Sequence, residues 1–423
     1  MNRRQLTLIL VAFVVLGGIG LWLRHRDVSS YETTSGAMGQ KVLGEFDPNA
    51  VTRFVLRRGT NSLALAQKDE RWVVAERGDY PANFAEVGET LRKLWNLKIA
   101  QPVSGPLGAS AIERLELDPD ATNQPATVIE LLDKDGKTLK SLLLGKQHRR
   151  RPATPSRMGG EEGWPDGRYV MVAGQTASAS LVSETFSNLE PRPESWLNKD
   201  FFKVEKTLSV SVTYPEATNS WHLTRPTETG EWTLQEAQPG ETLDTTKTSG
   251  LANALSWPSF DDVLVNPSPA DYGLDEPILA QLTTADGFQY ALQIGRREGE
   301  EKYYLTVNAT ADFPKERTAD AEEKPEDKER LDKEFKEKTD KLTEKLQKEK
   351  ALSGWVFQVS KWTLDSLLKK RTELLKDPAK EEVDTATAAP FGVPPPINPV
   401  DATLPPLPPL PPELPDHDDE HEE

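Results

Sequence analysis

The chain has 423 residues, of which 36% are hydrophobic and 28% charged, with a formal net charge of −17 and no cysteine. This length allows two or three domains with cores of their own. The negative charge argues against nucleic acid as a partner, and the lack of cysteine excludes disulfides, thiol nucleophiles and thiolate zinc sites.

Residues 1–26 predict a membrane anchor. The run LTLILVAFVVLGGIGLWL, residues 6–23, carries no charge, and as a helix it spans roughly 27 Å, close to the thickness of a bilayer core. Basic residues flank both ends, so charge bias does not orient it, and no small-residue cleavage site follows, which favours an anchor over a removed signal peptide. A short tail before a large body is typical of a signal anchor, so we expect a single-pass inner-membrane protein with a periplasmic body. A polar linker is predicted over 27–44.

Residues 45–200 predict an antiparallel α+β repeat. Apolar and polar residues alternate along three short runs, and a helix with apolar residues every three or four positions follows. Further on, an Asp-Gly pair predicts a hairpin tip. Ser183 is the expected N-cap of a closing helix that carries Phe186 and Leu189. The runs are 51–58, 62–67 and 71–76, the helix faces inward with Phe84, Val87, Leu91, Leu94 and Trp95, and the tip is Asp135 and Gly136.

The same order of elements returns in residues 201–376, which predicts a tandem duplication of one α+β module. Three alternating runs precede a helix between Asp244 and Trp257, and another Asp-Gly tip follows. Ser360 is the expected cap of the last helix. The runs are 207–214, 219–225 and 231–236, the tip is Asp286 and Gly287, the first helix buries Leu251, Ala254 and Leu255, and the last one carries Leu364, Leu367, Leu368 and Leu375.

The stretch DYGLDEP, residues 271–277, has enough carboxylates to suggest a metal loop. However, Asp271, Asp275 and Glu276 lack the regular alternation of ligands found in a calcium loop. We interpret the stretch as a short structural element, stiffened by proline, that leads into the hairpin. The counterpart in the first repeat is LELDPD, residues 115–120.

A basic loop is inserted after the first hairpin, between residues 146 and 167. Its cationic residues are candidate contacts for anionic lipid headgroups, a phosphate-bearing polymer or an acidic partner. The alternative, which we favour, is a solvated loop without a ligand. The candidate residues are Lys146, Arg149, Arg150, Arg151 and Arg157.

The second repeat contains an insertion, residues 309–352, that is almost entirely charged. Several Glu and Lys residues lie four positions apart, which predicts a long helix. Its apolar stripe is too narrow to enter a core, so we expect a protruding solvated helix, with a coiled-coil contact to a partner as the alternative. The stripe is Leu331, Phe335, Leu342 and Leu346, and the pairs are Glu329 with Lys333, Glu334 with Lys338, Glu337 with Lys341 and Glu344 with Lys348.

Residues 377–423 contain proline repeats followed by an acidic end, a composition typical of a disordered tail. The PPLPPLPP run is a candidate ligand for an aromatic-lined groove. His417 and His421 lie among carboxylates without a rigid scaffold, so we expect no specific metal site there.

The sequence contains no Walker lysine loop, Rossmann glycine triplet or HExxH motif. His148 and His222 could serve a Ser-His-Asp arrangement, but neither lies near a nucleophile-elbow glycine pattern. We therefore expect neither an enzyme nor a bound cofactor or metal, although the 68 acidic residues leave room for a carboxylate pair.

The motifs together resemble a bacterial family, domain of unknown function 4340. They are the N-terminal anchor, RWVVAE, YGLDEP, LQIG, the YYL strand and the closing Val-Ser step, and they cover about residues 44–376 outside the charged insertion. The motifs are structural, so the resemblance implies a fold and carries over no active-site residues. Members are often encoded beside ABC-type exporters and the auxiliary proteins associated with gliding-motility transporters, which implies an extracytoplasmic accessory role.

The leading hypothesis is a non-enzymatic, membrane-anchored accessory or scaffolding component of an ABC-type transport system. Its expected partners are transporter subunits or other envelope proteins, and its oligomeric state is open. One alternative is a module that binds envelope polymer or anionic lipid through the basic loop. The other is an envelope hydrolase that uses carboxylates.

Overall fold

The computed structural model describes residues 37–103, 107–150, 163–175, 178–314, 316–317 and 324–376. Of these, the residues up to Leu375 belong to one compact unit. The predicted anchor, Arg151, Arg157 and the proline-rich tail lie outside the described residues. Within the described ranges, no helix combines the length and apolar character needed to cross a bilayer.

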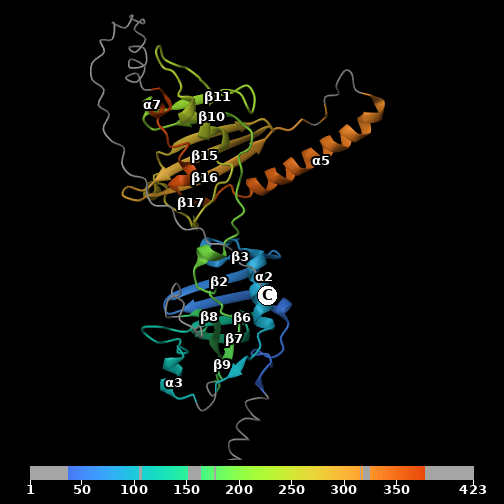
Figure 1. Cartoon of the computed structure of the whole chain (residues 1–423), viewed down its shortest axis with the longest axis vertical. Helices are drawn as coiled ribbons and strands as arrows, with labels where there is room; N and C mark the ends of the chain where they lie inside the picture. The colour runs from blue at the N-terminus through green and yellow to red at the C-terminus, as the bar shows by residue number, and fades with distance from the viewer. Residues whose placement is uncertain are drawn as a thin grey trace, which may run out of the picture. The chain divides into compact units, whose positions relative to one another are not determined.

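The first sheet contains nine strands in the described part of the chain, in the order β4-β3-β2-β1-β6-β7-β8-β9-β5 (Figure 1). Every neighbouring pair is antiparallel. The alternation of the sequence gives one buried face, since Phe54 and Leu56 of β1 are buried between exposed or half-buried neighbours. The strands are β1 (Arg53–Arg58), β2 (Asn61–Lys68), β3 (Arg71–Val74), β4 (Tyr80–Pro81), β5 (Gln101–Pro102), β6 (Thr127–Leu132), β7 (Thr138–Arg150), β8 (Trp164–Val172) and β9 (Ser180–Val182).

The second sheet contains eight strands among the described residues, again all antiparallel, in the order β12-β11-β10-β14-β15-β16-β17-β13. Taken in chain order, each of these strands occupies the same place in its sheet as a strand of the first sheet. Only β4 has no counterpart. The strands are β10 (Thr207–Thr213), β11 (Trp221–Thr224), β12 (Thr233–Leu234), β13 (Asp262–Leu264), β14 (Ile278–Thr284), β15 (Phe288–Arg296), β16 (Lys302–Ala311) and β17 (Val356–Ser360).

The predicted α+β class with antiparallel strands is therefore confirmed, and helices are few. Both Asp-Gly pairs form hairpin tips, as predicted: Gly136 and Gly287 follow β6 and β14 and have φ angles of +75° and +85°. The helices are α2 (Phe84–Trp95), α3 (Ala109–Arg114), α4 (Thr245–Thr248), α5 (Pro325–Lys350), α6 (Lys361–Leu364) and α7 (Arg371–Leu374).

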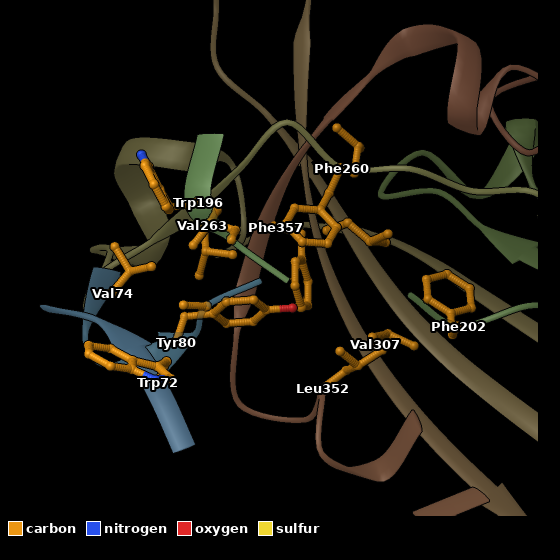
Figure 2. Packing of buried hydrophobic residues seen from close by; sticks show 14 of the residues in the cluster. Trp72, Val74, Tyr80, Trp196, Phe202, Phe260, Val263, Val307, Leu352 and Phe357 are labelled. Carbon is orange, nitrogen blue, oxygen red and sulfur yellow. The ribbon is translucent and has the colours of Figure 1, made fainter. Parts of the chain in front are cut away.

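The main hydrophobic cluster contains buried residues from both sheets. Tyr80 lies edge-on to the rings of Trp355 and Phe357, with centroid distances of 5.1 and 6.1 Å. Figure 2 shows its ring pointing toward Phe357. Nearby, Arg77 donates to both carboxylate oxygens of Asp262, at 2.6 and 2.8 Å. Aromatic contacts and a bidentate ion pair therefore connect the two halves of the chain.

The YGLDEP stretch packs its backbone directly against the end of β15. A Cβ atom on Gly295 would clash with the carbonyl oxygen of Tyr272. At the matching place in the first sheet, a Cβ on Gly145 would clash with the carbonyl oxygen of Leu115. The interpretation of the stretch as a structural element is confirmed, because both glycines permit a close crossing of two backbones.

The predicted closing helix of the first repeat is wrong. Residues 183–189 form no helix, although Phe186 and Leu189 are buried as expected. Phe186 has a φ of +49°, and Arg168 donates to the carbonyl oxygens of Thr185 and Phe186. These carbonyls would otherwise accept the hydrogen bonds of a helix. Because the partly buried guanidinium of Arg168 takes these carbonyls, an irregular turn replaces the helix.

The last predicted helix is broken into the short helices α6 and α7. The carbonyl of Lys369, between them, accepts from Trp221 Nε1 at 2.7 Å and from the Tyr214 hydroxyl at 3.2 Å. These side chains thus take a carbonyl that a continuous helix would use, and the helix is interrupted at this point. The predicted stripe is otherwise inward-facing, since Leu364 and Leu367 are buried and Leu368 and Leu375 half-buried.

The predicted helix between Asp244 and Trp257 is shorter than expected. Asp244 caps α4, and a 3-10 helix, Ser249–Asn253, continues it. Threonines, a serine and a glycine in TTKTSG have low helix propensity, which explains the early end. The inward positions are confirmed, since Leu251, Ala254 and Leu255 are buried.

The charged insertion forms the 26-residue helix α5, as predicted. The expectation that its stripe stays out of the core is wrong for the C-terminal turns. Leu346 belongs to the main cluster and Leu342 packs against it, while Lys338 forms an ion pair with Asp286 at 3.0 Å. Farther from its C-terminus, the helix extends away from the second sheet (Figure 1). The end of α5 therefore anchors to the body and the remainder projects.

The chain joins the body before the predicted start of the first repeat at residue 45. Leu43 is buried in the main cluster, and Val42 N donates to Leu97 O at 2.8 Å. Gly39 N similarly donates to Ile99 O. Residues 39–44 of the predicted linker are therefore fixed to the segment that follows α2.

Candidate functional site

A groove of about 740 Å³ opens beside α2, between that helix, the edge of the first sheet and the segment before β1. Its size lies in the range of small-ligand sites. Four aromatic rings and five polar side chains line it. The lining residues are Glu45, Phe46, Asp47, Pro48, Asn49, Val51, Gln67, Trp72, Phe84, Gly88, Leu91, Arg92 and Trp95.

The helix α2 forms at this place because its N-terminus is capped and one face is apolar. Asn83 Oδ1 accepts from Glu86 N at 3.3 Å. The buried face consists of Val87, Thr90, Leu91 and Leu94. These residues attach the helix to the sheet and leave its adjoining side free to form a wall of the groove.

The predicted burial of Phe84 is wrong. The sequence places it on the inward face, but its side chain is 69% exposed and lines the groove. Thr90 belongs to the buried face, which rotates Phe84 and Trp95 to the edge of the contact with the sheet. Trp95 is half-buried and also lines the groove. Two aromatic residues of the predicted core stripe are therefore available for contact with a ligand.

Gly88 lies in the middle of α2 and lines the groove. A glycine inside a helix costs about 1 kcal/mol relative to alanine. No packing requirement explains it here, since a Cβ atom on Gly88 would meet no heavy atom within 4 Å. Its negative φ also gives no reason for glycine. The missing side chain leaves the helix backbone open to the groove.

The charges of the groove are mostly compensated. Lys41 Nζ lies 3.0 Å from Glu45 Oε2 and 4.0 Å from the centroid of the Trp95 ring. Asp47 Oδ1 accepts from Asn49 N at 2.9 Å. The Arg92 guanidinium makes no hydrogen bond or ion pair with another described residue. The arrangement can hydrogen-bond to a ligand as both donor and acceptor.

The predicted basic loop is partly a hairpin. Lys146, Arg149 and Arg150 lie on β7, because β7 and β8 continue to the pair Arg150 and Trp164. Lys146 Nζ is 3.9 Å from a carboxylate oxygen of Glu116. Trp164 is 60% exposed beside the basic residues. The structure thus brings three of the five candidate residues together, and Arg151 and Arg157 lie outside the described residues.

The two histidines considered for catalysis occupy strand positions. His222 lies on β11 between buried neighbours, as predicted, and its Nε2 is 2.9 Å from Ser209 Oγ. His148 Nδ1 is 2.6 Å from Asp166 Oδ1. Neither pair extends to a third catalytic partner among the described residues. The same ranges contain no group of three or more His, Cys, Asp or Glu side chains that could hold a metal ion.

A second cleft, of about 560 Å³, lies between α5 and the segment before β10. Its Glu349 side chain is 5% exposed and accepts from Lys203 N at 2.9 Å and from the Tyr290 hydroxyl at 2.8 Å. Burial raises the pKa of Glu349 and of Tyr290. Because both carboxylate oxygens are occupied, the arrangement is a clasp that holds α5 to the second sheet.

The comparisons with known proteins agree with the resemblance seen in the sequence. Residues 72–277 match the family model described as domain of unknown function (DUF4340). The resemblance to DUF4340 is thereby confirmed over these residues. The matched region begins at Trp72 in β3 and ends at Pro277, the last residue of DYGLDEP, so it includes parts of both sheets. Neither the curated proteins nor the solved structures gave a match.

A smaller cleft, of about 310 Å³, is lined in part by residues of the DUF4340 match, and both Trp257 and Trp362 line it. The two side chains are 75% and 76% exposed, although Trp362 itself lies beyond the matched residues. Lys203 Nζ is 4.4 Å from the Trp257 ring centroid. Trp95, at the end of α2 in the first repeat, is in contrast half-buried.

Sequence reasoning missed the groove beside α2. The aromatic residues of the DUF4340 W-x-V motif and of α2 fit equally well into a core, and helical periodicity does not distinguish a buried face from its edge. The one available signal was Gly88, an isolated glycine inside a strongly amphipathic helix.

Proposed function

We propose that the chain is a non-enzymatic, single-pass membrane protein whose body acts outside the cytoplasm as an accessory or scaffolding component of an ABC-type transport system. The groove beside α2 is the surface with which it holds another component. The groove carries this proposal, because exposed aromatic rings surrounded by hydrogen-bonding side chains are typical of binding sites.

Two further observations support the proposal. The uncharged run at residues 6–23 favours an anchor that keeps the body next to the membrane. The matching strand order of the two sheets supports duplication of one module, over 45–200 and 201–376. A duplicated module on an anchor offers several contact surfaces to one assembly.

The proposal is tested by purification of the tagged full chain in mild detergent, followed by mass spectrometry. We expect ABC-transporter subunits to accompany the unaltered chain and to decrease with Gly88→Leu, which fills the groove. Ala109→Leu, on the exposed helix α3 away from the groove, is the matched control. Absence of any transporter subunit or envelope protein from the unaltered sample would refute the proposal.

The basic hairpin favours a second function, contact with anionic lipid. Arg149 and Arg150 adjoin the exposed Trp164, and tryptophan with basic residues is a common combination at membrane interfaces. Hydrogen exchange of the full chain in nanodiscs checks this. Anionic lipid should slow exchange in β7 and β8 relative to zwitterionic lipid, and Arg149→Ala with Arg150→Ala should remove the difference. Equal exchange in both lipids discards the idea.

A further inference from the structure

We propose that the groove beside α2 binds a neutral carbohydrate chain, a segment of an oligosaccharide or polysaccharide. This inference rests on the proposed function insofar as it takes the groove to be a binding surface. It goes further by naming the chemical class that enters the groove: a carbohydrate chain carried by the component that the groove holds.

The aromatic lining fits the faces of sugar rings. Phe84 is 69% exposed, and the half-buried Phe46 and Trp95 also line the groove. The C–H groups of a pyranose ring form an apolar face, which packs against the negative face of an aromatic ring. Several rings along one groove therefore suit a chain of consecutive sugar units better than one compact molecule.

The polar lining fits sugar hydroxyl groups. Gln67 and Asn49 supply amides, Arg92 supplies a planar set of N–H donors, and Glu45 and Asp47 supply carboxylate acceptors. A hydroxyl group both donates and accepts, so neighbouring hydroxyls can use all of these groups. A purely apolar ligand would instead bury the carboxylates and amides without hydrogen-bond partners, which is unfavourable.

The charge of the groove selects a neutral ligand. Its two carboxylates already have partners, since Glu45 pairs with Lys41 and Asp47 caps the backbone at Asn49. An anionic ligand such as a phosphate would meet these carboxylates, with Arg92 as the cation in the lining. A cationic ligand would have to compete with Lys41. The balance favours hydrogen bonding over ion pairing.

The absence of a side chain at Gly88 shapes the groove beside α2. Without a side chain at this position, a flat ring can lie against the backbone of α2 between Phe84 and Trp95. Glycine commonly occurs where a ligand approaches the backbone closely. The destabilising choice of glycine in mid-helix is thus explained by the ligand.

The test uses the detergent-solubilised full chain and calorimetric titration with neutral hexasaccharides of glucose, xylose, mannose and N-acetylglucosamine. We expect at least one of them to bind and to perturb the fluorescence of the groove tryptophans. Gly88→Leu and, separately, Phe84→Ala should weaken that binding by about tenfold or more. Ala109→Leu, which lies outside the groove, should leave it unchanged.

Three results would overturn the inference: no hexasaccharide binds, binding is unaffected by Gly88→Leu, or a proline-rich peptide of similar length binds in the groove while the sugars do not. Circular dichroism shows that each variant is folded. The result is independent of co-purification: a chain that binds sugar but carries no transporter subunit contradicts only the accessory role, and the reverse outcome contradicts only the carbohydrate ligand.

Discussion

The space around glycine differs among three positions of this protein. Gly145 and Gly295 permit a backbone crossing, whereas Gly88 faces open space. Gly145→Ala and Gly295→Ala should each lower the free energy of unfolding by about 2 to 3 kcal/mol, because the added methyl group collides with a backbone carbonyl. Gly88→Ala should instead raise it by about 0.5 to 1 kcal/mol. Urea denaturation followed by circular dichroism measures all three, and equal effects would contradict the distinction.

Glu241 and Arg371 form a close ion pair, with two hydrogen bonds of 2.9 and 2.6 Å and both side chains less than one-fifth exposed. The hydrogen bonds from Arg371 lower the pKa of Glu241 to about 2. The unfolded chain has the ordinary value near 4.3, so the pair stabilises the fold above that pH and the stabilisation is lost as the pH falls toward about 2.

The variant Glu241→Gln should therefore lower the free energy of unfolding at neutral pH by about 1 to 2 kcal/mol, after allowance for solvent screening. The difference between the variant and the unaltered chain should shrink between pH 5 and pH 3. Thermal unfolding over that range checks it, with Glu45→Gln, on an exposed ion pair, as the control. A difference that does not change with pH would show that the charge of Glu241 contributes nothing.

Individual residue positions were predictable where one physical effect dominates. Leu251 and Leu364 are buried as expected, since an apolar position within a periodic pattern has few alternatives. Phe84 was not, because its exposure depends on Thr90 turning the helix against the sheet. The groove therefore required three-dimensional packing to be seen.

The helix α5 owes its position to a few contacts at its C-terminal end. Glu349→Ala should destabilise by about 1 to 3 kcal/mol, because it leaves the Lys203 N–H without its acceptor and leaves the Tyr290 hydroxyl with the Lys203 carbonyl oxygen alone. Glu349→Gln keeps an acceptor and removes a buried charge, so its cost at neutral pH should be much smaller. Hydrogen exchange of residues 338–350 measures the attachment of the helix, and equal effects of the two variants would contradict the clasp.

The sign of the pH dependence follows from the raised pKa of Glu349. The Glu349 carboxyl binds its proton more tightly in the folded state than in the unfolded state. Its contribution to the free energy of unfolding is therefore fully present below the unfolded pKa of about 4.3, and it is lost as the pH rises through the folded pKa. Glu349→Gln should remove this decrease. Persistence of the same slope in the variant would assign it to other groups.

Strands and hairpins were predicted more successfully than helices. The alternating runs and the Asp-Gly tips are local signals, and they gave the antiparallel pairs of both sheets. The two closing helices failed because Arg168, Trp221 and Tyr214, remote in sequence, take the carbonyl oxygens that a helix needs. Periodicity contains no information about such partners.

The two halves of the chain share one main cluster, and the ion pair of Arg77 with Asp262 is a charged contact between them. Hydrogen bonding to Asp262 raises the pKa of Arg77, and both side chains are 21% exposed. A double-mutant cycle with Arg77→Ala and Asp262→Ala should give a coupling free energy of about 1 to 3 kcal/mol. A single unfolding transition is expected in the unaltered chain, and a coupling near zero would contradict a shared interface.

The architecture of the molecule could be predicted because the sequence repeats its pattern. The proposed binding groove could not, because it uses residues that equally suit a core. Trp72 is buried and still lines the groove. A binding surface built from core-type residues has no separate sequence signature.

The central claim, that the protein acts by contact through the groove beside α2, is tested most directly by photocrosslinking in cells. A benzophenone amino acid replaces Phe84, whose exposed ring lines the groove, in the full chain. We expect a crosslink to an envelope component. It should disappear when Gly88→Leu fills the groove and persist with Ala109→Leu. No crosslink, or one that is unchanged by Gly88→Leu, would contradict it.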